Sequence, residues 1–97
     1  MPVPRLDRRR ANPEPANLVG KRVREVRLLR GKSQDALASA VQDELNQIFP
    51  GMPLVIDQSD ISRLESGKRP VWDYELRALA LALTVSADFL LGVAGKA

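Results

Sequence analysis

The sequence predicts an all-α domain of five short helices. Residues that commonly cap helices recur along the chain, and an apolar stripe with helical spacing follows each of them. Strict alternation of apolar and polar residues, which is typical of strands, does not occur. A chain of 97 residues has room for one domain, and only 4% of them are aromatic, so the core must be mainly aliphatic.

The first helix is expected to start after Asn17 as N-cap and to run to Arg30. Gly31 supplies a C-terminal stop, since glycine readily adopts the left-handed conformation that ends helices. Helical spacing places one set of residues on the inner face, with Leu29 alongside: Val19, Val23, Val26 and Arg30.

The second helix is expected to begin after Ser33 as N-cap and to fade near Gln47. Its apolar stripe consists of Leu37, Ala38, Val41 and Leu45. Prolines and a glycine interrupt helical structure beyond it, so residues 48–56 (IFPGMPLVI) are predicted to form an apolar loop. Such a loop is either a lid over the core or a surface for a partner, because Met52, Leu54, Val55 and Ile56 are too apolar to face water without a reason.

The remaining helices are shorter. Asp57 is the expected cap of the third, at about 58–66, and Asp60 three residues on suggests a capping box. The inner face of this helix holds Ile61 and Leu64, and Gly67 ends it.

Asp73 is predicted to cap a fourth helix, and Ser86 a short fifth helix (ADFLL) that ends at Gly92. The stripe of the fourth helix consists of Leu76, Leu79, Ala80 and Leu83.

Charge is distributed unevenly along the chain. Residues 1–32 carry ten Lys and Arg against three acids, whereas residues 33–66 carry one against six. Residues 1–16 contain four prolines and four arginines, and this composition predicts a flexible basic N-terminal arm. The domain organisation is therefore an arm (1–16), a folded domain (17–93) and a short tail (94–97).

Composition also narrows the function. Cysteine and histidine are both missing, which removes disulfides, thiolate metal sites and the commonest general base. We therefore expect neither an enzyme nor a bound metal or cofactor. The absence of a signal-like or membrane-spanning apolar run leads us to expect a cytoplasmic protein without a membrane partner.

Three stretches between Leu18 and Gly92 carry a family resemblance: GKRVREVRLLRGKSQDALA, DISRLESGKRPV and DYELRALALALTVSADFLLG. Together they resemble the phage-repressor and Cro-type helix-turn-helix family, also called Xre-like. ISRLESGKR is the most specific phrase. The resemblance implies a five-helix, lambda-repressor-like DNA-binding domain, and here the connection between helices two and three is lengthened.

In this family the third helix lies in the major groove of DNA and reads base edges. The residues that would read bases, on the face opposite Ile61 and Leu64, are Gln58, Ser59, Ser62 and Arg63. Glutamine suits adenine, arginine suits guanine, and serine suits either. The alternative is an ordinary polar outer face of a surface helix. Asp60 could accept from cytosine, but capping is the favoured role.

Other roles also follow from the resemblance. The expected phosphate contacts are Gln34, Lys68 and Arg69, although the last two would also suit a solvated basic turn. Arg27 and Glu65 resemble the family's structural ion pair. In the arm, basic residues would track phosphate or enter a minor groove, as basic arms can: Arg5, Arg8, Arg9 and Arg10.

The leading functional hypothesis is a transcriptional repressor that binds double-stranded DNA as a homodimer. Candidate dimer residues are Val71, Trp72, Tyr74 and Phe89, although Trp72 and Phe89 could simply fill the core. The alternative is a protein-binding module, such as an antitoxin or a regulatory subunit that sequesters a partner, for which the loop at 48–56 offers a surface.

Overall fold

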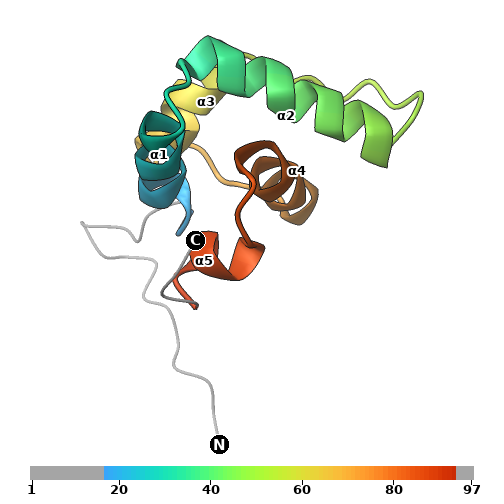
Figure 1. Cartoon of the computed structure of the whole chain (residues 1–97). Coiled ribbons are helices and arrows are strands. Elements are labelled where there is room, and N and C mark those ends of the chain that lie inside the picture. The colour runs from blue at the N-terminus through green and yellow to red at the C-terminus, as the bar shows by residue number, and fades with distance from the viewer. Residues whose placement is uncertain (1–16, 94–97) are drawn as a thin grey trace, which may run out of the picture.

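Five α-helices make up the part of the chain that the computed structural model describes, residues 17–93 (Figure 1). That range contains no strand, so the predicted all-α class is confirmed. The four arginines predicted to form a basic arm lie outside the described residues. The helices are α1 (Gly20–Leu29), α2 (Gln34–Ile48), α3 (Gln58–Glu65), α4 (Asp73–Leu83) and α5 (Ala87–Leu91).

Three helices begin at the caps that the sequence predicted. Ser33 and Ser86 each accept, through Oγ, the backbone N–H of the residue three positions on, at 3.0 Å. Asp57 and Asp60 form a reciprocal capping box, with N···O distances of 2.9 and 3.0 Å. These bonds satisfy backbone donors that the first turn of a helix would otherwise leave unpaired.

Three helices end at the predicted glycines in the same way. The φ angles of Gly31, Gly67 and Gly92 are +69°, +76° and +82°, which residues other than glycine rarely adopt. After α1, the N–H of Gly31 donates to Leu28 O at 3.0 Å and that of Lys32 donates to Arg27 O at 3.1 Å. This pattern turns the chain sharply away from the helix axis.

The start of α1 differs from the prediction. Asn17 is not the N-cap, because the helix begins at Gly20 and Val19 occupies that position. The Asn17 side chain nevertheless accepts the Gly20 N–H through Oδ1 at 2.6 Å. Its Nδ2 donates to the carbonyls of Leu64 (3.1 Å) and Arg69 (2.7 Å). Asn17 therefore binds the entry of α1 to the end of α3.

The last turn of α1 also differs from the prediction. Leu29, expected beside the inner face, is 82% exposed. Arg30 is exposed as well, and its Nε donates to the carbonyl of Leu83 at the C-terminus of α4, at 3.0 Å. A basic group is favourable there because the last carbonyls of a helix lack helical partners and carry partial negative charge.

The start of α4 differs from the prediction by one residue. Trp72 rather than Asp73 is the N-cap. Its backbone N–H donates to Glu75 Oε1 at 3.0 Å, so Glu75 supplies the acceptor at this helix start.

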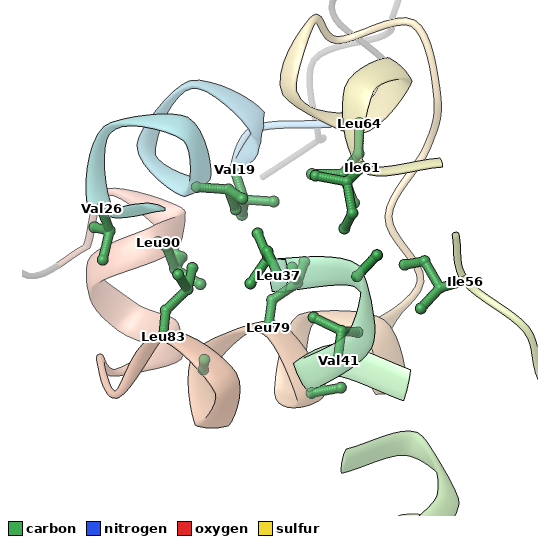
Figure 2. Packing of buried hydrophobic residues seen from close by; sticks show 14 of the residues in the cluster. Val19, Val26, Leu37, Val41, Ile56, Ile61, Leu64, Leu79, Leu83 and Leu90 are labelled. Atoms are coloured by element: carbon green, nitrogen blue, oxygen red, sulfur yellow. The ribbon is translucent and has the colours of Figure 1, made fainter. Parts of the chain in front are cut away.

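The core lies where all five helices meet (Figure 2). α2 packs most extensively against α4, and α3 packs against both α2 and α1. The predicted apolar stripes supply most of the buried side chains, and Ile56 joins them from the connection between α2 and α3. The inner face of α3, formed by Ile61 and Leu64, is completely buried. Burial of this face fixes which side of α3 is turned outward.

The connection between α2 and α3 follows the side of α2. Gln42 holds it there, because Nε2 donates to Leu54 O at 2.7 Å and Oε1 accepts from Ile56 N at 3.0 Å. Leu54 and Ile56 pack against the core, whereas Met52 and Val55 are exposed. Part of the connection is therefore the lid that one interpretation of the sequence predicted, and part is open surface.

Candidate nucleic-acid interface

The outer face of α3 carries the residues that sequence analysis selected as base readers. Gln58, Ser59 and Arg63 are exposed, and Ser62 is half-buried. Because Ile61 and Leu64 on the opposite face are buried in the core, the orientation of α3 is fixed and these side chains point away from the core. The helix is eight residues long and is capped at its start, where Gln58 and Ser59 lie.

A chain of hydrogen bonds leads from this face into the core. Gln58 Nε2 donates to Gln34 Oε1 at 2.7 Å, and Gln34 Nε2 donates to Glu65 Oε1 at 3.1 Å. Glu65 in turn accepts from Arg27. Since Gln34 and Gln58 are the first residues of α2 and α3, the N-termini of these two helices open on the same side of the molecule.

The ion pair expected between Arg27 and Glu65 is present and buried. Arg27 Nε lies 2.6 Å from Glu65 Oε2, and the side chains are only 9% and 3% exposed. A second bond from Arg27 Nη2 to Glu65 Oε1 measures 3.0 Å, and Nη1 donates to Lys32 O at 2.8 Å. The hydrogen bond from Glu65, together with its charge, raises the pKa of Arg27 despite the opposing effect of burial. This pair joins α1 to α3.

Arg69 is placed differently from the phosphate contact that the resemblance implied. Its guanidinium makes two bonds to the Glu75 carboxylate, at 2.9 and 2.7 Å, and its Nε lies 3.6 Å from Asp60 Oδ1. The side chain is only 17% exposed. The hydrogen bond to Glu75 raises the pKa of Arg69 even though burial opposes the charge. In this structure Arg69 therefore joins the exit of α3 to α4, and Lys68 is the exposed cation of that turn.

Asp60 has the capping role that was favoured for it. It also accepts from Arg63 Nη2 at 2.7 Å, on the outer face of α3. Burial on its own would raise the pKa of Asp60. The hydrogen bonds from Asp57 and Arg63 and the charge of Arg69 outweigh that effect and hold the pKa below its ordinary value.

An open groove of about 400 Å³ lies between α2 and the start of α3. Three carboxylates line it: Asp35, Asp43 and Asp57. Negative charge here opposes the entry of a phosphate into the groove itself, whereas Lys68 adds positive charge beyond the other end of α3.

Several residues that organise this region were missed by sequence reasoning. Asn17 was predicted only as a cap, and neither Gln42 nor Glu75 was singled out. Glu75 had a usable signal, because a Glu three residues beyond a helix start is typical of a capping box. The long-range bonds of Asn17 and Gln42 have no counterpart in helical spacing.

Over residues 17–93, no helix is both long and apolar enough to cross a membrane. The same range holds no group of three or more Asp, Glu, His or Cys side chains arranged around a possible metal ion. In comparisons with protein-family models, curated proteins and solved structures, no match to this chain was found.

Proposed function

We propose that this chain is a sequence-specific transcriptional regulator, most simply a repressor, that reads the major groove of double-stranded DNA with α3. The observation that carries the proposal is the two-sided character of α3. Ile61 and Leu64 are completely buried, while Gln58 and Arg63 are exposed on the other side. A short helix held rigidly in this way is what major-groove reading requires. Such a regulator would act in the cytoplasm.

Phosphate contacts would flank the reading helix. Gln34 lies at the N-terminus of α2, where unpaired backbone N–H groups and the helix dipole favour an anion. Lys68 is exposed just beyond α3 and adds a positive charge. Arg69 would act indirectly, because its bonds to Glu75 hold the turn that carries Lys68.

We propose a homodimer on a two-fold site, since one short helix reads few base pairs. An apolar hollow of about 210 Å³ near the start of α1 is lined in part by Leu18, Val71 and Leu91. Trp72, next in sequence to Val71, is 54% exposed, so it does not fill the core. Tyr74 and Phe89 instead pack partly against the core.

Footprinting tests the dimer. It should show two half-sites centred roughly 10 base pairs apart, and a single asymmetric half-site at saturation would contradict the dimer.

The decisive experiment is selection from random DNA, followed by binding of variants to the selected site. Gln58→Ala or Arg63→Ala should weaken binding by about 1–3 kcal/mol and relax preference at particular base pairs. Binding to random DNA should change less, because phosphate contacts dominate there. Arg77→Ala, which alters α4 rather than α3, is the matched control. Unchanged site and affinity in both α3 variants would rule out α3 as the reader.

The second candidate function is a protein-binding module, such as an antitoxin or a regulatory subunit that sequesters a partner. Exposed apolar side chains favour it, notably Met52 and Val55 on the connection and Trp72 before α4. Retention on heparin separates the two functions. A DNA-binding protein should elute later and with strong salt dependence, whereas a module that binds only protein should show little of either.

A further inference from the structure

Asp60 is anchored to the protein, although it lies on the helix proposed to read DNA. Its Oδ2 accepts the N–H of Asp57 at 3.0 Å, and the Nε of Arg69 lies 3.6 Å from its Oδ1. The same Oδ1 accepts from Arg63 Nη2 at 2.7 Å. The Asp60 side chain is 17% exposed and that of Arg63 is 59% exposed. The carboxylate of Asp60 is therefore held in place, and its bond to the exposed guanidinium of Arg63 restricts the rotamers of that side chain.

Stability does not account for this contact. An exposed ion pair three residues apart on a helix adds little to folding, because water screens it and two side chains lose freedom. The capping bonds of Asp60 need only the oxygen that faces Asp57. The bond to Arg63 engages the other oxygen and is dispensable for the cap.

The contact between Asp60 and Arg63 is better explained by the orientation that it gives to the Arg63 guanidinium. A guanidinium is planar and carries five N–H donors, two of them on Nη2. A bond from one N–H of Nη2 to Asp60 leaves the other N–H of Nη2 free to face a base together with an N–H of Nη1 or Nε. Guanine presents two acceptors in the major groove, O6 and N7, and a correctly directed arginine meets both at once. A side chain that is already held in place loses less conformational entropy on binding.

We propose that Asp60 is a positioning residue that presets the Arg63 guanidinium for guanine and thereby sets how strictly Arg63 discriminates between base pairs. The inference rests on the proposed function, because it needs α3 in the major groove. The negative charge of Asp60 also increases the discrimination between base pairs. Where no guanine engages Arg63, the carboxylate only opposes the approach of DNA.

Asp60→Asn tests the proposal. The amide oxygen can still accept from Asp57, so the cap remains, whereas the amide nitrogen cannot accept from Arg63. The melting temperature should fall by no more than a few degrees. Discrimination at the base pair read by Arg63 should fall roughly 3–10-fold, the size expected when one long side chain is no longer held in place. Affinity for random DNA should stay constant or rise.

A double-mutant cycle separates positioning from charge. In the Arg63→Ala background, Asp60→Asn should cause no further change in base preference, since the positioned group is gone. Asp73→Asn removes an exposed carboxylate at the start of α4 and controls for net charge.

Full discrimination in Asp60→Asn, or an equal loss in Asp73→Asn, would overturn the positioning role while the reading role of α3 stands. If Arg63→Ala and Gln58→Ala both leave the preferred site unchanged, the proposed function fails, and the positioning role fails with it.

Discussion

At the scale of single residues, Glu65 links the core to the proposed reading surface through hydrogen bonds. Its carboxylate accepts two bonds from Arg27 in the core and one from Gln34, which in turn accepts from Gln58 on the surface. Among residues 17–93, every buried side-chain nitrogen or oxygen has a hydrogen-bond partner. Loss of the carboxylate would leave several of these groups unsatisfied together.

Glu65→Ala should therefore destabilise the domain severely. The variant leaves the buried guanidinium of Arg27 without its counter-charge, which typically costs about 3–5 kcal/mol. Urea unfolding measures the loss, and Glu25→Ala on the exposed side of α1 is the control. DNA binding should fall only as far as the folded fraction falls. A Glu65→Ala protein as stable as the parent would show that the pair contributes nothing to folding.

The lowered pKa of Asp60 predicts that the free energy of unfolding depends on pH in the acidic range. Its pKa in the folded protein lies below the ordinary value of 3.8, so the folded state favours the ionised form. The resulting stabilisation is fully present above the ordinary pKa and is lost as the pH falls through the lowered one. The stability difference between the parent and Asp60→Asn should be constant near neutral pH and shrink below pH 3.8. Urea unfolding over a pH series checks this, and a difference that grows in acid would contradict it.

At the scale of elements, the connection between α2 and α3 both covers the core and presents side chains to solvent. Ile56 is buried among core residues (Figure 2), whereas Val55, its neighbour, is exposed. The backbone on either side of Val55 is bound to Gln42. Alternation along this extended segment turns one side chain inward and the next one outward.

Leu54→Ser together with Ile56→Ser should lower the melting temperature by at least several degrees. Removal of a buried aliphatic side chain costs about 2–5 kcal/mol, and 1 kcal/mol corresponds to roughly 4–8 °C for a domain of this size. Met52→Ser together with Val55→Ser is the matched pair on the exposed side and should leave melting unchanged. Calorimetry measures both. A stable Leu54/Ile56 variant that loses only self-association would instead identify a partner surface.

The contact between α1 and α3 depends on a residue that the sequence analysis did not single out. At Gly20 a Cβ atom would collide with the carbonyl oxygen of Leu64, at the end of α3. The missing side chain lets the two backbones approach closely. Asn17 and the ion pair of Arg27 with Glu65 reinforce the same contact between the two helices.

At the scale of the whole molecule, residues 1–16 carry four Arg against two acids, whereas the folded domain of residues 17–93 carries ten Lys and Arg against ten Asp and Glu. Among the described residues, the members of the core run from Val19 to Leu90. Phosphate binding is the role that we expect for the arginines of residues 1–16.

Deletion of residues 1–16 should leave the melting temperature nearly unchanged and weaken binding to every DNA sequence. The logarithmic dependence of affinity on salt should flatten by about 0.9 for each phosphate that the arm would otherwise neutralise. Fluorescence titrations at several salt concentrations measure the slope. As a control, replacing Arg5, Arg8, Arg9 and Arg10 by Gln in the full-length chain should reproduce the effect. Equal affinity and slope after the deletion would deny the arm any part in binding.

The sequence by itself determined that five helices form and most of the residues on their inner faces, but not where α1 and α4 begin. Caps such as Ser33, stops such as Gly31 and apolar spacing act within a few residues of the chain, so they can be read locally. The partnership of Arg27 with Glu65, 38 residues apart, came only from the family resemblance. Base reading by α3 stays a prediction.

Only the tertiary structure decided which polar groups satisfy one another. It paired Arg69 with Glu75, Asn17 with the end of α3 and Gln42 with the connection beyond α2. A charged or amide side chain has several candidate partners of similar energy, and the choice depends on which of them the packed helices bring within about 3 Å. Helical spacing carries no information about that distance, because it is set by contacts between residues far apart in the chain.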